Sequence, residues 1–368
     1  MKRSLHLLPQ FWVANQQYIY KIVSAIRRTP PLLVLLLLLV ATGLAARNNP
    51  NRPHPQGNQA TDQVSFRQNC VNAVSQIDQQ INNVRARLTT GGDIWWDGSN
   101  GRYIVPKPAP GAPEVSSLFA AGIWIAGRDP GGNIKVAAQQ YGRGSGNFDY
   151  YPGPLHEGSA DFPGGPLQDP RRGTTGPDTC ARWDQFFVVS GANVQAHINA
   201  WREAQAQGET SLPPSTIPED ILGWPARGNE FFADIHQFDL PNTMQGLAGF
   251  WDQDFDGIYE PHEGDYPIVE IRGCSGNLPP SNPDEIIFWI FNDNGNAHRE
   301  SGSASVIQME VQVQAFAYKA NNDLNNMTFQ RYKLINRAIE RLDSSYFGLW
   351  VDPDLGCYTD DYIGCDVE

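Results

Sequence analysis

The segment VIQMEVQVQAFAYK, residues 306–319, alternates between apolar and polar side chains. The apolar set comprises Ile307, Met309, Val311, Val313 and Ala315, and the polar set between them comprises Gln308, Glu310, Gln312 and Gln314. Successive side chains of a β-strand point to opposite faces of the sheet. This period of two therefore predicts an antiparallel strand with one face buried and the other in water.

Neighbouring segments extend this strand into a sheet. The apolar run 285–291 (EIIFWIF) predicts a buried strand, and residues 327–337 and 344–351 predict two more strands joined by polar turns. Long strands in series are typical of sandwiches and jelly rolls. The expected fold is mainly β with a few helices (α+β), with an antiparallel β-sandwich or jelly-roll-like C-terminal part and long Gly/Pro-rich loops.

The pattern before residue 250 is mixed. Apolar residues three to five apart predict a helical stretch within residues 64–88, whereas residues 82–106 and 120–141 predict strands separated by Gly-containing turns. Residues 142–180 are rich in Gly, Pro and Asp and predict an ordered surface excursion.

One further helix begins near Asn193 and closes at Gly208. It places Val194, Ile198 and Trp201 on one face, with His197 beside them. A single histidine at such a position is more often packed or exposed than a ligand, so we assign it no function.

Composition excludes several classes of protein. The 368 residues include 10 Trp, 13 Tyr and 17 Phe, which can fill a large core and argue against general disorder. The net charge is −13, and residues 1–46 hold basic but no acidic side chains, so the remainder is more acidic still. Nucleic acid and anionic lipid repel such a chain, which makes a nucleic-acid function improbable.

The N-terminus has the features of an export signal. The apolar run from Leu32 to Ala46 follows Arg27 and Arg28 and ends in small residues. It is short for a hydrocarbon core of ~30 Å but suits a signal peptide. We interpret residues 1–46 as a signal peptide that is cleaved, with an uncleaved membrane anchor at residues 32–46 as the alternative.

The rest of the chain divides into three regions by pattern. Residues 47–62 are a polar, Pro-rich linker, residues 63–250 are a mixed β/α region, and residues 251–368 contain an acidic loop followed by sandwich-like strands. The sequence stops after a second acidic segment with no further strand, so we expect a C-terminally truncated product.

Export makes disulfide bonds plausible for the five cysteines. Cys357 and Cys365 lie eight residues apart in one loop and are predicted to pair. A second pairing, Cys180 with Cys274, is a weaker prediction that leaves Cys70 unpaired. Buried free thiols are the alternative.

Residues 252–263, the acidic loop, match the calcium-binding pattern D-x-[DN]-x-[DN]-G-x5-E. Calcium takes six to eight oxygen ligands, and acidic side chains at alternate positions converge when the chain wraps around the ion. The expected ligands are the side chains of Asp252, Asp254, Asp256, Glu260 and Glu263 and the carbonyl of Ile258. Pro261 and the following Gly264 argue against a helix–loop–helix hand, so we expect a loop that fastens extended chain.

A second cluster of acidic residues near the end of the chain predicts a second calcium site. It comprises Asp352, Asp354, Asp360, Asp361 and Asp366. The spacing fits no fixed ligand pattern, and a disulfide-pinned polar loop is the alternative.

The familiar catalytic patterns are missing from the sequence. It contains no HExxH, GxSxG or GxxxxGK[ST] motif, and the His-Glu-Gly triplets at His156 and His262 are expected by chance. Trp95 and Trp96 could stack on sugars, although adjacent tryptophans are more often core residues. We therefore assign no catalytic residue.

Several longer motifs, including DIWWD (93–97), WDQDFDGIYEPHEGDYP (251–267) and GLWVDPDLGCYTDDYIGCD (348–366), resemble a known family. They are similar to the N-terminal ectodomain of large secreted Bacteroidota proteins that typically end in a type IX secretion sorting domain. The resemblance spans roughly residues 80–366 and implies export to the cell surface rather than an activity. No sorting domain is present in this sequence.

These observations favour an exported, calcium-stabilised structural or adhesion module of the cell surface without catalytic activity. Its expected cofactor is Ca²⁺, and its partner is an unknown extracellular protein or glycan. Membrane contact is expected only through an uncleaved leader. The alternative is a carbohydrate-binding module or glycan-active hydrolase.

Overall fold

The computed structural model describes residues 69–157, 173–241, 246–270 and 282–354, together with Thr359 and Gly364. The chain divides into two units, Met1–Ser65 and Phe66–Glu368, and all described residues belong to the second. The predicted leader and linker lie outside the described residues.

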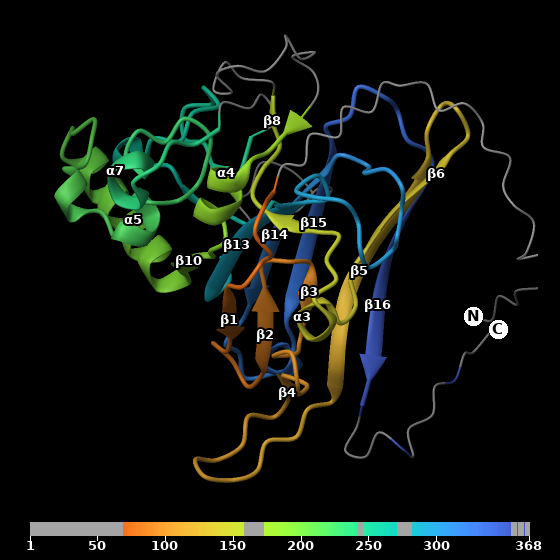
Figure 1. The fold of residues 1–368 in the computed structure, drawn as a ribbon. Coiled ribbons are helices and arrows are strands. Elements are labelled where there is room, and N and C mark those ends of the chain that lie inside the picture. Colours follow the sequence, from red (N-terminus) through yellow and green to blue (C-terminus); the bar gives the residue numbers. More distant parts are fainter. Residues whose placement is uncertain are drawn as a thin grey trace, which may run out of the picture. The chain divides into compact units, whose positions relative to one another are not determined.

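The first sheet contains seven antiparallel strands (Figure 1). Five follow the order β1 (Gln76–Gln79), β2 (Arg85–Thr89), β3 (Asp93–Ile94), β5 (Leu118–Arg128) and β16 (Asp343–Pro353). The two others are β4 (Tyr103–Ile104), which pairs with β2, and β6 (Ile134–Ala138), which pairs with β5. The strands predicted within residues 120–141 are β5 and β6, and the Gly-containing turn between them is their connection.

The second sheet contains five antiparallel strands. Its order is β10 (Phe187–Ser190), β13 (Glu285–Asn292), β14 (Met309–Ala317) and β15 (Phe329–Asn336), with β7 (Tyr151–Pro152) also paired to β13. The strands predicted at 285–291, 327–337 and 344–351 are thus β13, β15 and β16. Two small hairpins complete the described strands: β8 (His156–Glu157) with β9 (Gly173–Thr174), and β11 (Phe250–Trp251) with β12 (Tyr266–Pro267).

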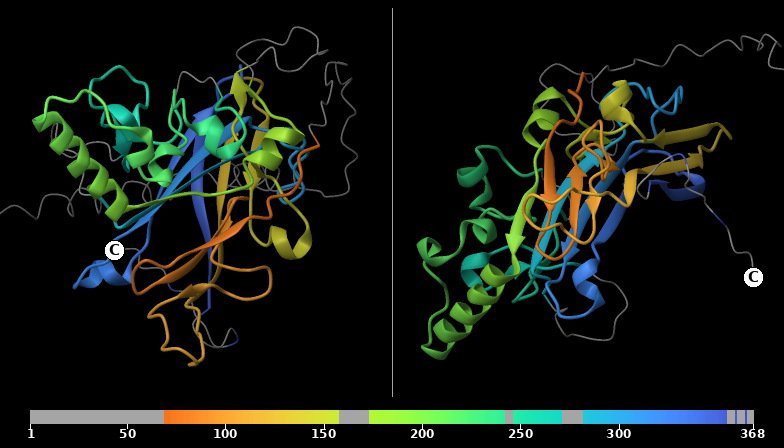
Figure 2. Two further views of the ribbon diagram at one scale, coloured as in Figure 1. Left: turned by 90° about the vertical axis from the view of Figure 1, so that its left-hand side faces the viewer. Right: turned by 90° about the horizontal axis from the view of Figure 1, so that it is seen from below.

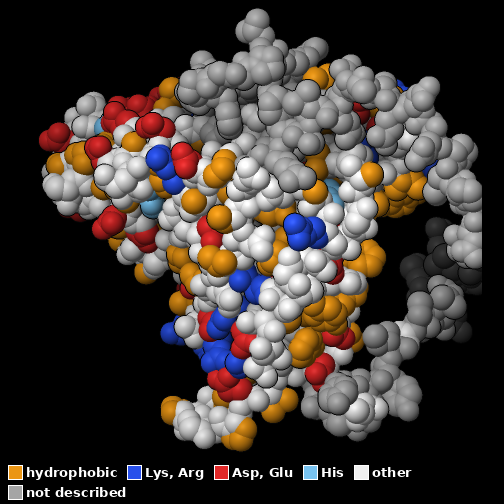
Figure 3. Space-filling model, in the orientation of Figure 1, with side chains coloured by type: hydrophobic (Ala, Val, Ile, Leu, Met, Phe, Trp, Pro, Cys, Tyr) orange, Lys and Arg blue, Asp and Glu red, His pale blue; other side chains and the backbone are white. Residues whose placement is uncertain are grey.

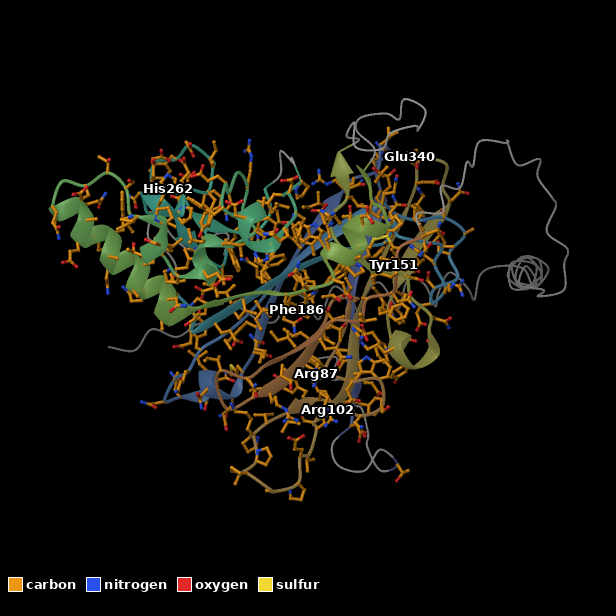
Figure 4. All side chains as sticks on the ribbon, turned by 60° about the vertical axis from the view of Figure 1, so that its left-hand side comes forward. Arg87, Arg102, Tyr151, Phe186, His262 and Glu340 are labelled. Atoms are coloured by element: carbon orange, nitrogen blue, oxygen red, sulfur yellow. A yellow bond between two sulfur atoms is a disulfide. The ribbon has the colours of Figure 1, made fainter. Side chains whose placement is uncertain are left out.

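The two sheets pack face to face around a shared apolar core. Ile123 and Ile125 of β5 belong to the same buried cluster as Trp289 of β13 and Val311 and Val313 of β14. Phe186 packs edge-on against Trp289 in this core (Figure 4). The expected class, mainly β with an antiparallel sandwich and a few helices, is confirmed.

A layer of helices and loops covers the other face of the second sheet (Figure 2). Its main helix is α5 (Gly191–Ala206), which matches the helix predicted near Asn193, and it is joined by α6 (Glu219–Leu222) and α7 (Phe232–His236). The remaining short elements are α3 (Gly142–Ser145), α4 (Pro177–Arg182), η1 (Pro214–Thr216), η2 (Pro261–Glu263) and η3 (Asp323–Asn326). Trp201 and Phe232 of this layer share a second core with Phe288 of β13 and Phe316 of β14.

This layer overturns the prediction of a half-exposed strand at residues 306–319. Every residue of β14 is buried, because its apolar face meets the first sheet and its polar face meets the helical layer. Hydrogen bonds satisfy much of that polar face: Gln314 donates to the Ile268 carbonyl (2.8 Å), and Glu310 accepts from the Leu155 amide (2.8 Å). Buried polar groups are tolerated when they are hydrogen-bonded.

The helix predicted within residues 64–88 is wrong. Residues 76–79 form β1 and residues 85–89 form β2, which pair with each other. Val71 and Val74, which were expected on the buried helix face, are exposed. The Asp184 carboxylate instead accepts hydrogen bonds from the Val74 and Ser75 amides (3.0 and 3.2 Å). A residue far away in the sequence therefore holds this segment in an extended form.

The surface excursion expected at residues 142–180 is also partly wrong. Phe148, Tyr150, Tyr151 and Leu155 are buried, and β7 joins the second sheet. The regions on either side of residue 250 share both sheets, since β5 pairs with β16 and β10 pairs with β13. They therefore form one unit.

The cysteine pairing differs from the prediction. Cys180 forms a disulfide with Cys70, with a Cα–Cα distance of 5.6 Å, so the Cys180–Cys274 prediction is wrong. Pairing by sequence failed because the spacing of distant cysteines carries no information on which of them the fold brings together. Cys274 and the predicted pair Cys357–Cys365 lie outside the described residues.

Candidate metal centre

The acidic loop emerges from a small hairpin. Trp251 of β11 lies opposite Tyr266 of β12, and their rings stack with centroids 6.2 Å apart. This pairing brings together the two ends of residues 252–265, so the acidic residues lie on a closed loop that is short and held at its base.

Three aspartates at the start of the loop accept hydrogen bonds from its own backbone. The Asp252 carboxylate accepts from the amides of Phe255 (2.6 Å) and Gly257 (2.8 Å). Asp254 and Asp256 each accept from the amide two residues ahead, at 3.2 and 2.7 Å. Gly257 has a φ of 80°, the left-handed conformation that glycine adopts without strain and that the pattern predicts at this position.

These hydrogen bonds gather the three carboxylates. Asp252, Asp254 and Asp256 each offer one oxygen, and the three oxygens lie within 4.8 Å of one another. Among the described residues, no lysine or arginine forms an ion pair with them. A carboxylate oxygen has a second lone pair after accepting an N–H, so the set can still bind a hard cation.

The C-terminal half of the predicted ligand set forms a separate group. Glu260 and Glu263 gather with His262, again within 4.8 Å, so the predicted ligands divide into a trio of aspartates and a pair of glutamates beside a histidine. Burial raises the pKa of Glu260, and the charges of Glu263 and Asp256 raise it further. The side chain of Ile258 is exposed, and its amide donates to Asp256.

His262 and Asp265 are the residues that the sequence pattern missed. His262, which was attributed to chance, lies in the helical layer, with Nε2 3.6 Å from Glu263 (Figure 4). Asp265 is only 2% exposed and accepts from the amides of Gln253 (2.8 Å) and Glu260 (2.9 Å). Desolvation raises its pKa to about 7, and the charges of Asp252 and Asp254 add to this effect.

The Asp265 carboxylate thus joins the two halves of the acidic loop. It lies beyond the last position of the calcium pattern, so that pattern could not find it. Asp265 directly precedes the aromatic Tyr266 of β12, and this is the one signal in the sequence that Asp265 is buried.

Helix α5 holds this loop in place. The Nε2 of His197 lies 3.0 Å from the Asp265 carbonyl, and burial lowers the pKa of His197, which favours the neutral ring. Gly264 has a φ of 102° and packs so closely on the Trp201 indole that a Cβ there would overlap the ring. The loop therefore contacts the α5 face that carries the second core. Of the two alternatives that the sequence left open for His197, packed or exposed, the structure shows the packed one.

The second predicted cluster cannot be assembled from the described residues. Asp352 accepts a hydrogen bond from the Tyr141 hydroxyl (2.5 Å), and burial together with this contact raises the pKa of Tyr141. Asp354 is the other described member, whereas Asp360, Asp361 and Asp366 lie outside the described residues.

The aromatic pair considered for sugar stacking is part of the interior. Trp96 is buried, and its indole N–H donates to the buried Asp93 carboxylate at 2.7 Å. Trp95 is partly buried and meets Tyr103 edge-on. The core interpretation of these two residues is therefore the correct one.

The described part of the chain also contains a histidine between two carboxylates, Asp149–His298–Asp293. All three side chains are fully buried. Because a reactant has no access to them, the arrangement is structural rather than catalytic.

Comparison of the chain with protein-family models, curated proteins and solved structures finds no match. Among the described residues, no helix is both long and apolar enough to cross a membrane.

Proposed function

We propose that this chain is an exported, non-enzymatic module that binds Ca²⁺ in its acidic loop and serves a structural or adhesive role outside the cell. The observation that carries the proposal is the trio Asp252, Asp254 and Asp256, whose oxygens lie within 4.8 Å of one another and which form no ion pair with a lysine or arginine of the described ranges. Three carboxylates this close repel one another, and a divalent cation relieves the repulsion.

The position of the acidic loop explains what the ion would do. The loop is closed by the β11–β12 hairpin and fixed to α5 through Asp265 and Gly264. An ion that draws the loop together would therefore brace the helical layer against the second sheet. The export signal predicted in residues 1–46 supports an environment in which millimolar calcium can fill even a weak site.

Thermal unfolding of the full chain tests the proposal. A ligand that binds only the folded state stabilises it by about 2.7 kcal/mol at one hundred times its Kd. We expect the Tm to rise by several degrees in millimolar CaCl₂ relative to EDTA, and to rise less in MgCl₂, which requires a stricter geometry.

A charge-removing variant makes the test specific. Asp254→Asn keeps an oxygen for the Asp256 amide but removes one negative charge from the trio, so it should abolish most of the calcium-dependent increase in Tm. Asp239→Asn, at an exposed aspartate outside the loop, is the matched control and should respond as the unchanged chain does. Equal Tm values in calcium and EDTA for the unchanged chain would refute the proposal.

A further inference from the structure

β16 lies at the edge of the first sheet as the described residues form it. Among the described strands it pairs only with β5, from Asp343 opposite Arg128 to Pro353 opposite Leu118. The N–H and C=O groups of its other side have no strand partner there. Such an edge is a template for another extended strand.

The side chains of this edge are unusually apolar. Tyr346 is 74% exposed, Phe347 45% and Leu349 49%, and no residue from 344 to 351 is charged. Hydrophobic side chains gather over the β5 and β16 side of the molecule in Figure 3. Natural proteins commonly protect an exposed edge with charge.

The register between β16 and β5 explains why Phe347 and Leu349 are exposed. Phe347 and Leu349 lie opposite Ile125 and Ile123, so they share the face of the first sheet that meets the second sheet. The second sheet ends at β15, whose Tyr332 meets Phe347 with ring centroids 5.5 Å apart. One additional strand beside β16 would extend the sheet and cover this apolar surface.

We propose that β16 pairs in antiparallel orientation with β16 of a second copy of this chain, across a two-fold axis at Gly348. The sequence around this glycine is self-complementary: Phe347 would lie opposite Leu349 of the second copy, and Tyr346 opposite its Trp350. Aromatic and aliphatic cross-strand pairs of this kind stabilise sheets. A two-fold interface repeats each pair twice.

The positions of the acidic residues of β16 are compatible with this register. Asp343 lies opposite Pro353 of the second copy, and Asp352 lies opposite its Ser344, so no two carboxylates face each other directly. The irregularities at Asp343/Tyr346 and Asp352/Pro353 restrict regular pairing to the middle of the strand. Interfaces below about 1,200 Å² are usually weak, so we expect a dimer that forms with rising concentration. This inference does not depend on calcium binding.

Sedimentation of the full chain over a range of concentrations is the first test. We expect the mass to rise from one chain to two, and we expect Phe347→Lys or Tyr346→Lys to weaken the dimer about tenfold, because each substitution occurs twice across the axis. Val188→Lys, at an exposed apolar residue on the edge strand β10 of the other sheet, should leave the dimer unchanged.

Oxidative cross-linking is the second test, and it leaves the apolar side chains of β16 unchanged. A Cβ added at Gly348 would have 4.0 Å to its nearest neighbour, the Trp124 Cβ, so Gly348→Cys fits. Across the proposed axis the two new thiols face each other at about 4.5–5.5 Å between Cβ atoms, close to disulfide geometry. We expect far more covalent dimer from Gly348→Cys than from Ser345→Cys or the unchanged chain.

Three results would overturn the proposal. They are a single-chain mass at every concentration, equal cross-linking by the two cysteine variants, and a dimer that survives Phe347→Lys but is lost with Leu334→Lys on β15. The last result would place the interface on the edge of the second sheet. The Tm of each lysine variant separates loss of pairing from loss of fold.

Discussion

The protonation of His298 follows from its surroundings. Its Nδ1 lies 2.7 Å from the Val136 carbonyl and its Nε2 lies 2.8 Å from the Asp293 carbonyl. Carbonyl oxygens only accept hydrogen bonds, so both ring nitrogens must donate and the ring is an imidazolium. Burial lowers the pKa of His298, but the hydrogen bond and charge of Asp293 and the charge of Asp149 outweigh it and raise the pKa to about 9.

The stability of the protein should therefore fall in mildly alkaline solution. The folded-state pKa of His298 exceeds the ordinary value of 6.5, so its contribution is complete below pH 6.5 and is lost as the pH rises to about 9. We expect a loss of about 1–3 kcal/mol in the free energy of unfolding over this range. Urea unfolding at several pH values measures it.

His298→Gln is the control for that measurement. It is less stable than the unchanged chain at pH 6.5, because one buried acceptor loses its donor, and its stability should change less between pH 6.5 and 9. Identical pH profiles for the two proteins would mean that another group causes the decline.

Gly264 is the second residue whose role can be tested by itself. Gly264→Ala places a Cβ against the Trp201 indole and forces alanine to a φ of 102°. We expect it to lower the free energy of unfolding by about 1–3 kcal/mol and to loosen the acidic loop. Gly208→Ala is a partial control, since Gly208 also has a positive φ (83°) but its Cβ would meet no atom within 4 Å. A similar loss in both variants would show that backbone strain alone is responsible.

At the residue scale, the sequence identified the aspartates at the start of the candidate site but not the residues that hold the loop in place. The three aspartates at alternate positions gather by hydrogen bonds to their own loop, which is local chemistry that a motif records. Asp265 was missed because its role depends on α5 and on the β11–β12 hairpin, which a loop pattern does not describe. His262 was missed because the calcium pattern leaves its position unspecified.

The disulfide between Cys70 and Cys180 fastens the segment before β1 to α4. The bond closes a loop of 110 residues, and cross-links across such loops typically contribute about 2–4 kcal/mol. We expect Cys70→Ala to lower the free energy of unfolding by this amount. A reducing agent should destabilise the unchanged chain but have a smaller effect on the variant. Equal effects of reductant on the two proteins would contradict a stabilising role for this bond.

The elements that were predicted correctly are those whose periodicity matches their environment. α5 buries Val194 and Trp201 on one face, and β13 is apolar from Ile286 to Phe291 because both of its faces are covered. The segment 64–88 was wrongly predicted because apolar residues three to five apart occur by chance in an extended chain. Its conformation depends on Asp184, more than a hundred residues away.

At the scale of the whole molecule, the sandwich followed from alternating strands, but the third layer did not. The glutamines of β14 resemble a solvent-facing set, and only the helical layer makes them interior residues. Glu310 of β14 illustrates the difficulty. It is buried beside Arg337, the residue that directly follows β15. No local pattern reports that such a pair will form.

The pairing of β5 with β16 sets the order in which the molecule can form. Ile123 has Leu349 as its neighbour, so one side of β5 stays open until a strand more than two hundred residues further along the chain has been synthesised. Closing loops of that length is slow. The first sheet therefore reaches its full width only late in folding, after strands far apart in the sequence have met.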